Sequence, residues 1–197
     1  MTPAPPRLLW VLIGPNGAGK STYYDTRVAP RLLAEFVNAD RIQAEELPDS
    51  GVRGSYAAAQ RAQARRDTLF AEGRSFVTET VGSHPSKLEL VRKAQALDYE
   101  VWVTFIYLES EDLSVARVRR RVRHGGHPVP DDKIRARYVR MAPIGVAAVL
   151  AADRGFVVDN SDSERPLRQV MVFDRGRPTW RCSDLPEWAS RLFSPKV

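Results

Sequence analysis

Residues 14–21 read Gly-Pro-Asn-Gly-Ala-Gly-Lys-Ser and match the pattern G-x-x-x-x-G-K-[ST] of a phosphate-binding loop. In such a loop the glycines let backbone N–H groups face phosphate oxygens, the lysine reaches the β- and γ-phosphates, and the serine ligates Mg²⁺. The pattern therefore predicts ATP and Mg²⁺ as cofactors, with Lys20 as a catalytic residue and Ser21 as the metal ligand. The residues expected to bind the nucleotide are Gly14, Asn16, Gly17, Ala18, Gly19, Lys20, Ser21 and Thr22. A glycine-rich turn without a ligand is the alternative, which is disfavoured because the loop follows an apolar run and precedes a helical segment.

Carboxylates at the ends of other predicted strands are the next candidates, because a nucleotide site alone does not define a reaction. Asp40 follows Phe-Val-Asn-Ala and is predicted to accept a proton from a substrate hydroxyl or to hold Mg²⁺ through water. Since Gln43 follows three residues later, the alternative is that Asp40 caps a helix. Glu79 and Thr80 end the segment Phe-Val-Thr-Glu-Thr, and together with Arg41 they are assigned to the substrate site. A solvated strand end is the alternative for Glu79 and Thr80.

Arginines crowd one later stretch of the chain. They are Arg117, Arg119, Arg120, Arg121 and Arg123. The i, i+3, i+4 spacing puts Arg117, Arg120 and Arg121 on one helix face, so a solvated face is one interpretation. The nearby Gly125-Gly126 pair permits a hinge, which favours a lid arginine that neutralises charge on the transferred phosphoryl group. We take Arg120 as this catalytic arginine, although the spacing does not distinguish it from its neighbours.

Three further residues have weaker indications. Asn160 follows the last predicted sheet strand and is expected to line the adenine pocket, with turn formation as the alternative. His124 and His127 lack neighbouring cysteine or carboxylate ligands, so we expect loop packing or a ligand contact there rather than zinc.

The elements that must position these residues alternate between strands and helices. The predicted strands are 8–13, 35–38, 75–79, 100–108 and 155–158, followed by a hairpin of 170–173 and 178–181. The predicted helices are 20–29, 55–72, 84–97, 112–123, 131–140 and 144–152. This alternation predicts an α/β fold of the P-loop NTPase, nucleotide-kinase-like type, with a mostly parallel sheet flanked by helices and ligands at the carboxyl ends of the strands. We expect a single domain over residues 1–197, with a helical lid at about 112–140 and a C-terminal hairpin plus helix at about 169–193.

Composition restricts the location and the partners of the protein. No apolar run approaches the roughly 20 residues that span a bilayer, so we expect no membrane segment. The run 8–13 is too short for a secretory signal, and a lone cysteine, Cys182, agrees with a reducing compartment, so a cytoplasmic location is predicted. The net charge of +6 fits either nucleic-acid binding or arginines that hold phosphates.

The segments GPNGAGKST, FVNADRI, FVTET and GGHPVP, in this order, resemble the zeta-toxin family of P-loop kinases, including its small stand-alone members. The resemblance covers roughly Leu8 to Asn160. It implies a kinase-like fold, with Asp40 as general base, Glu79 in the substrate or magnesium site, and lid arginines on the phosphates. It further implies UDP-N-acetylglucosamine as the acceptor and an antitoxin protein as a partner.

The function predicted from these observations is an ATP- and Mg²⁺-dependent kinase that transfers the γ-phosphoryl group to a hydroxyl of a small molecule. A nucleic-acid kinase or RNA-binding ATPase is the alternative, favoured by the positive charge but not by any basic motif interleaved with aromatic residues. A nucleotide-dependent switch ATPase is the third reading, and the LSGGQ-type signature of transporter ATPases is absent from the sequence.

Overall fold

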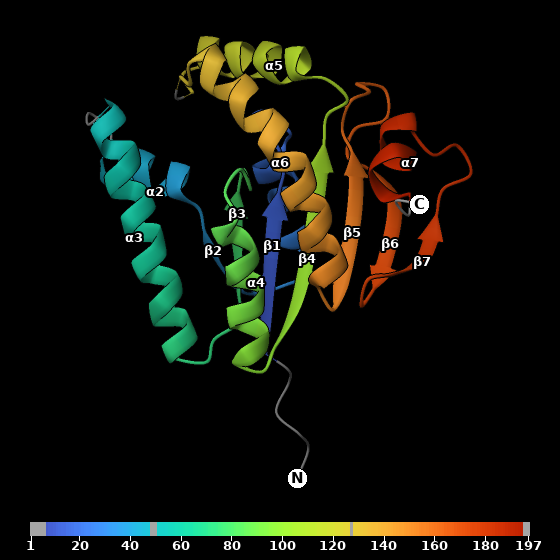
Figure 1. The fold of residues 1–197 in the computed structure, drawn as a ribbon. Coiled ribbons are helices and arrows are strands. Elements are labelled where there is room, and N and C mark those ends of the chain that lie inside the picture. Colours follow the sequence, from blue (N-terminus) through green and yellow to red (C-terminus); the bar gives the residue numbers. More distant parts are fainter. Residues whose placement is uncertain (1–6, 48–50, 127, 195–197) are drawn as a thin grey trace.

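The computed structural model describes residues 7–47, 51–126 and 128–194. In this part of the chain, helices cover both faces of a seven-stranded sheet whose strand order is β2-β3-β1-β4-β5-β6-β7 (Figure 1). The strands are β1 (Arg7–Ile13), β2 (Glu35–Val37), β3 (Phe76–Thr80), β4 (Tyr99–Tyr107), β5 (Arg154–Asp159), β6 (Arg168–Asp174) and β7 (Arg177–Arg181). The helices are α1 (Lys20–Tyr23), the π-helical turn η1 (Tyr24–Val28), α2 (Ala39–Glu46), α3 (Gly51–Ala71), α4 (Ser86–Ala96), α5 (Glu111–Arg123), α6 (Asp131–Ala151) and α7 (Glu187–Phe193).

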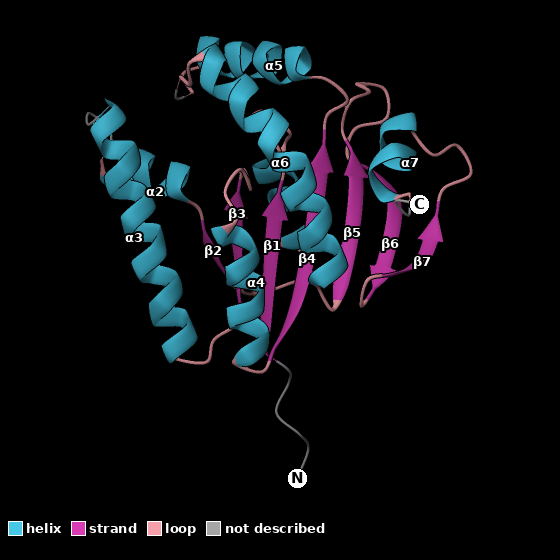
Figure 2. Ribbon diagram, viewed as in Figure 1, coloured by secondary structure: helices cyan, strands magenta, loops and turns pink. Residues whose placement is uncertain are grey.

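Parallel pairing of the first five strands brings their carboxyl ends to one edge (Figure 2). The central strand β1 pairs with both β3 and β4, and its register aligns Leu12 with Glu79 and Ile13 with Thr80. The phosphate-binding loop that follows β1 therefore lies beside the end of β3. The predicted α/β P-loop fold with a mostly parallel sheet is confirmed.

Side chains of β1 alternate between two apolar cores, as expected for a strand buried on both faces. Leu9, Val11 and Ile13 pack in a core that includes residues of α3, α4, α6 and α7. Trp10 and Leu12 pack on the opposite face with Tyr23 and Val28, from α1 and η1. These two layers fix the start of α1, and with it Lys20 and Ser21, against the end of β1.

The predicted break between two helices near residue 142 is wrong, because α6 runs without interruption from Asp131 to Ala151. Pro143 lies inside this helix and cannot donate a hydrogen bond to the carbonyl of Val139. Both residues are exposed, so water can satisfy that carbonyl. Met141 and Gly145 are buried, and their packing holds the helix together across the proline.

The sequence predicted 155–158 as the last strand of the sheet and a small hairpin after it. In the structure the two strands of this hairpin extend the main sheet. β6 pairs antiparallel with β5, and β7 pairs antiparallel with β6. The long helix α3 also begins at Gly51, four residues before its predicted start at Ser55. In the described residues no helix is both long enough and apolar enough to cross a membrane.

Candidate active site

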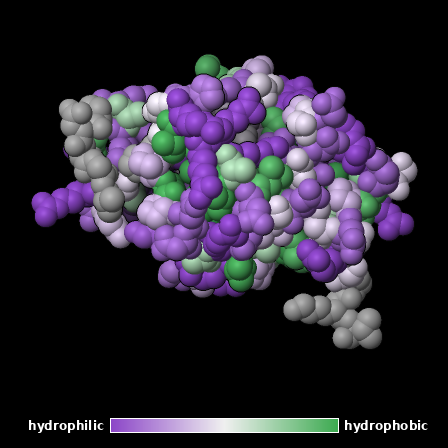
Figure 3. Space-filling view, turned by 90° about the horizontal axis from the view of Figure 1, so that it is seen from above, coloured by the Kyte–Doolittle hydropathy of each residue, from purple (hydrophilic) through white to green (hydrophobic). Residues whose placement is uncertain are grey.

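A cleft of about 700 Å³ opens at the carboxyl edge of the parallel strands. Its walls are the phosphate-binding loop, the start of α2, one face of α3, the loop after β3, and the facing sides of α5 and α6. Seen from above, this edge of the molecule is covered mainly by hydrophilic side chains (Figure 3). The structure thus brings the predicted phosphate loop, Asp40, Glu79 and Thr80 together in one cleft.

Glycines of the phosphate-binding loop occupy positions that a side chain would disturb. A Cβ atom on Gly14 would lie 2.1 Å from the carbonyl oxygen of Ile106. Gly17 and Gly19 have φ angles of +74° and +85°, in the region that favours glycine. Ser114 Oγ donates to the carbonyl of Asn16 at 2.6 Å, which ties the loop to α5. The loop is therefore a fixed backbone cradle of the kind that binds phosphate groups.

Lys20 lies inside this loop, and only 6% of the residue is exposed. Its Nζ donates to the carbonyls of Gly14 and Pro15, both at 3.0 Å, and lies 3.7 Å from Glu79 Oε1. The ammonium group is thus held at the point where the loop and β3 meet, as expected for a lysine that contacts nucleotide phosphates.

Glu79 connects the predicted metal ligand with the start of α2. Ser21 Oγ donates to Glu79 Oε2 at 2.8 Å, and Asn38 Nδ2 donates to the same oxygen at 2.9 Å. The Asn38 side chain also accepts hydrogen bonds from the backbone N–H groups of Asp40 and Arg41, so Asn38 is the N-cap of α2. Asn38, which was not predicted as a site residue, therefore fixes both the carboxylate of Glu79 and the helix that carries Asp40.

Asp40 occupies the second position of α2 and projects into the cleft. Its side chain is 65% exposed, and its Oδ2 atom lies 3.9 Å from Arg121 Nη1 of α5. The competing N-cap role falls to Asn38 rather than to Asp40. An exposed carboxylate on the cleft wall can contact an incoming hydroxyl, as a general base must.

Two arginines of α5, Arg117 and Arg121, line the cleft, whereas the predicted Arg120 does not. Each α-helical residue turns the side-chain direction by about 100°. Arg121, four residues after Arg117, therefore points in nearly the same direction, whereas Arg120 points further to the other side. Arg120 is exposed on α5 outside the cleft lining. Burial lowers the pKa of Arg117, and the carboxylate of Asp159 partly opposes this shift. Arg117 nevertheless stays cationic, because an arginine pKa is far above neutral pH.

Of the other two predicted substrate residues, Thr80 lies in the cleft and Arg41 lies outside it. Thr80 lines the cleft, and its Oγ1 accepts a hydrogen bond from the backbone N–H of Gly82. Thr22 also lines the cleft. Arg41 instead donates to Asp25 Oδ1 at 2.6 Å and stacks over the Phe36 ring, so it lies outside the cleft lining. His127 lies outside the described residues.

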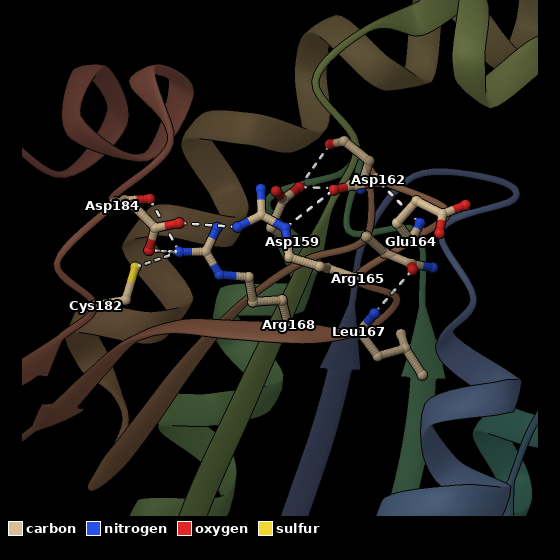
Figure 4. Close-up of polar contacts among 10 residues, drawn as sticks. Asp159, Asp162, Glu164, Arg165, Leu167, Arg168, Cys182 and Asp184 are labelled. Carbon is tan, nitrogen blue, oxygen red and sulfur yellow. Dashed lines mark hydrogen bonds and ion pairs between the residues drawn. The ribbon is translucent and has the colours of Figure 1, made fainter.

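Asn160 joins the phosphate-binding loop to the segment after β5. Its Nδ2 donates to the carbonyl of Ala18 at 2.8 Å, and its Oδ1 accepts from the N–H of Leu167 at 3.0 Å. Ion pairs hold the segment between Asn160 and Leu167. Arg165 pairs with both Asp162 and Asp184, and Asp184 also pairs with Arg168 (Figure 4). Asn160 thus supports the nucleotide loop from behind, and its predicted contact with adenine stays a prediction.

Replacing Asn160 by alanine is expected to lower the free energy of unfolding by about 1–3 kcal/mol, because the carbonyl of Ala18 and the N–H of Leu167 would lose their partner in a buried place. Chemical denaturation measures this change, and ATP affinity should fall with it. Asn160→Asp, which keeps only the bond from Leu167, should weaken ATP binding more because it places a carboxylate against the phosphate loop. A loss no larger than that of the exposed control Gln169→Ala would contradict the role of Asn160.

The affinity for ATP should depend on pH through Lys20. Burial lowers the pKa of Lys20 from its ordinary value of 10.5, and the charges of Glu79 and Asp40 oppose this shift while Arg121 adds to it. Phosphates beside the lysine would favour its charged form and raise its pKa, so binding takes up a proton above the lowered pKa. ATP affinity should therefore fall as pH rises above that lowered pKa, which calorimetry can follow. Lys20→Arg should remove this fall because a guanidinium stays charged, and an unchanged slope in that variant would exclude Lys20 as its source.

The described residues contain no group of three or more His, Cys, Asp or Glu side chains that could hold a metal ion by themselves. They do provide the hydroxyl of Ser21 and the carboxylate of Glu79 next to each other. Such a pair fits Mg²⁺, which prefers oxygen ligands and commonly uses one or two protein groups together with water and substrate phosphates.

Comparison with known proteins agrees with this geometry. A sequence model described as an AAA domain matches residues 9–144, and no curated protein matches the sequence significantly. The AvrRxo1-ORF1:-ORF2 complex crystallised with ATP contains a similar chain, with a TM-score of 0.71 and 14% identity over 98% of this chain and 65% of that chain. This protein therefore spans less than two thirds of that relative.

Two other solved structures share the fold. The PezAT chromosomal toxin–antitoxin system of Streptococcus pneumoniae contains a chain with a TM-score of 0.67 and 15% identity, over 92% of this chain and 76% of that chain. A proposed kinase from Chloroflexus aurantiacus has a TM-score of 0.61 and 18% identity, over 81% of this chain and 91% of that chain. At the level of fold, the predicted resemblance to zeta-toxin-like P-loop kinases is confirmed.

Proposed function

Because the chain belongs to the AAA domain family and has the fold of kinase-like P-loop NTPases, we propose that it is an ATP- and Mg²⁺-dependent small-molecule kinase. The observation that carries this proposal is that Glu79 accepts a hydrogen bond from Ser21 and forms an ion pair with Lys20, in the same cleft as the exposed carboxylate of Asp40. A phosphate cradle beside an accessible base is what transfer to a hydroxyl requires.

Magnesium would be held by Ser21 and Glu79, whose oxygens are already neighbours. When bound, the ion would neutralise charge on the β- and γ-phosphates of ATP. Lys20 would donate to the same phosphate oxygens, for which it must leave or share the carbonyls of Gly14 and Pro15. Asn38 would keep the Glu79 carboxylate oriented during this exchange.

Asp40 would take the proton of the acceptor hydroxyl, whose oxygen then bonds to the γ-phosphorus. The bond between that phosphorus and the oxygen bridging to the β-phosphate breaks, so that ADP leaves. Arg117 and Arg121, which face the cleft from α5, would stabilise the negative charge that spreads over the phosphoryl oxygens during transfer.

UDP-N-acetylglucosamine is the acceptor that the resemblance to zeta toxins suggests. Purified protein incubated with ATP, Mg²⁺ and this sugar nucleotide should yield a product one phosphate heavier by mass spectrometry. A metabolite extract serves as the second acceptor pool. If neither gains a phosphate, the kinase proposal fails, and rapid ATP hydrolysis without any acceptor would favour the switch ATPase instead.

A nucleic-acid substrate is the second candidate, and the charge of the cleft favours it. Lys20, Lys87, Lys133 and several arginines line the cleft, whereas Asp40 and Glu79 are the only acidic residues among the described residues of its lining. If RNA is the substrate, affinity for an oligonucleotide should fall steeply with salt concentration, because phosphate contacts release counterions. A flat salt dependence would exclude such contacts.

The partner proposed for this chain is an antitoxin protein, which rests on its likeness to the PezAT toxin–antitoxin system. An antitoxin that inhibits the kinase by covering its cleft would lower the affinity of the purified protein for ATP or for the acceptor. Co-expression with the product of a neighbouring gene, followed by size-exclusion chromatography and the phosphoryl-transfer assay, tests the proposal. Failure of the two chains to co-elute would reject that partner.

A further inference from the structure

One wall of the cleft carries two cations that the proposed mechanism does not use. Arg66 lies on the face of α3 that lines the cleft, and Lys87 lies in the first turn of α4. The two side chains come from helices that are separated by β3 in the sequence, and the charge of Arg66 contributes to lowering the pKa of Lys87. They form a compact positive feature, which we call the α3–α4 basic pair.

Arg66 is unusually buried for a charged side chain, with 9% of the residue exposed. Its Nη2 donates to Gln63 Oε1 at 2.7 Å, but its Nε is buried and has no hydrogen-bond partner among the described residues. The neighbouring carboxylate of Asp67 is instead bonded by Lys93 at 2.6 Å and by Gln63 at 3.0 Å. A buried guanidinium with an unused donor is costly unless a ligand completes its hydrogen bonds.

Lys87 is partly buried and has no acidic side chain within ion-pair distance in the described part of the chain. Burial, followed by the charge of Arg66, lowers its pKa. Its position in the first turn of α4 also places the positive end of a helix dipole at the same wall. An anion bound here would therefore meet two side-chain cations and a favourable helix terminus.

The strand order separates this wall from the side of the phosphate loop to which Asn160 is bonded. Asn160 follows β5, on one side of β1, whereas α3 contacts β2 and α4 begins in the segment after β3, and both of these strands lie on the other side of β1. Asp40, which follows β2, and Glu79, at the end of β3, are the residues expected to face the acceptor, and they lie on the same side of β1. The basic pair thus lies on the acceptor side of the phosphate loop.

We propose that Arg66 and Lys87 bind an anionic group, a phosphate or a carboxylate, of the molecule whose hydroxyl is phosphorylated. This inference rests on the proposed kinase function and narrows its substrate class, because it excludes neutral sugars and alcohols as preferred acceptors. Guanidinium binds either anion with two parallel hydrogen bonds, and the ammonium of Lys87 adds a charge without fixed geometry.

Three matched probes test the proposal: glycerol 3-phosphate, glycerate and glycerol share a carbon chain and differ in charge. Each is titrated by saturation-transfer NMR into protein saturated with Mg²⁺ and a non-hydrolysable ATP analogue, which covers the phosphate loop. At least one anionic probe should bind saturably, and glycerol should bind at least tenfold more weakly. Equal binding of glycerol, or no saturable binding of either anion, would overturn the proposal.

Two variants locate the binding to the pair. Arg66→Gln and Lys87→Gln should each raise the Kd of the anionic probe about tenfold or more, as expected for loss of a charge-assisted hydrogen bond. Arg61→Gln removes the same charge from an exposed position of α3 outside the cleft and should leave the Kd unchanged. An unaltered affinity for the ATP analogue shows that each variant is folded. If both cleft variants bind the probe like the wild type, the inference is wrong.

This binding test is independent of turnover. Binding that depends on Arg66 in a protein that transfers no phosphate would overturn the kinase proposal alone. If Arg66→Gln and Lys87→Gln both still transfer phosphate and bind the anionic probe with an unchanged Kd, only the proposed anion site would be overturned.

Discussion

Asp40→Asn is expected to lower the rate of phosphoryl transfer by about 10²–10⁴-fold, the range typical of a lost general base. The amide has nearly the same shape as the carboxylate and keeps the position of α2, whose N-cap is Asn38, but it cannot accept the hydroxyl proton. Because the Asp40 side chain is exposed and its ion pair is with Arg121 of α5, ATP affinity should change little.

Single-turnover kinetics with a confirmed acceptor separates these two effects, since they report the chemical step apart from ATP binding. Glu45→Gln provides a matched control, because Glu45 is an exposed carboxylate on the same helix and lies outside the cleft lining. If Asp40→Asn transfers phosphate at the rate of the Glu45 variant, another group must accept the proton.

Lys20→Met is expected to reduce kcat/KM by about 10²–10³-fold, as does removal of one preorganised donor to a charge that develops in a transition state. Methionine keeps much of the length and apolar volume of lysine, so the loop should retain its shape. The Glu79 carboxylate would lose its closest cation, however, and its repulsion of nucleotide phosphates should also weaken ATP binding.

Calorimetric titration with ATP and steady-state kinetics measure the two losses for Lys20→Met. Lys93→Met is the control, because Lys93 is an exposed lysine of α4 outside the cleft. Circular dichroism establishes that both variants are folded. Retention of wild-type kcat/KM in Lys20→Met would mean that the loop binds phosphates through backbone groups alone, and the proposed role of the lysine would be abandoned.

The features predicted well from the sequence are those that depend on local pattern. The apolar run before Gly14 could only be a buried strand, and the glycine spacing imposed a strand-to-helix turn, so the phosphate loop followed directly. Parallel pairing with β1 then brought Glu79 to the edge that carries the phosphate loop, because neighbouring parallel strands have their carboxyl ends at the same edge of the sheet. Ser21 and Glu79 are accordingly in contact, 58 positions apart in the sequence.

Residues whose role depends on the rotation or path of a helix were missed. Arg120 was chosen over Arg117 and Arg121 because spacing gives the faces of a helix but not which face the rest of the molecule covers. Arg66 belongs to no motif, and it reaches the cleft only because α3 returns along the sheet beside α2. Asn38 could have been found from its N-cap position before Ala-Asp-Arg, although its bond to Glu79 could not.

Because α6 is uninterrupted, a displacement at one end of the helix would be transmitted to the other end. At 1.5 Å per residue the helix is roughly 30 Å long, so a tilt of about 10° around its buried half would displace the other end by a few ångströms. Lys133 and Arg137 lie on the half of α6 that lines the cleft, whereas Gly145 packs against Phe105 of β4, where an added Cβ would lie 2.4 Å from the ring. A methyl group at Gly145 should therefore shift α6 relative to the sheet, and with it Lys133 and Arg137, without contacting any residue of the proposed mechanism.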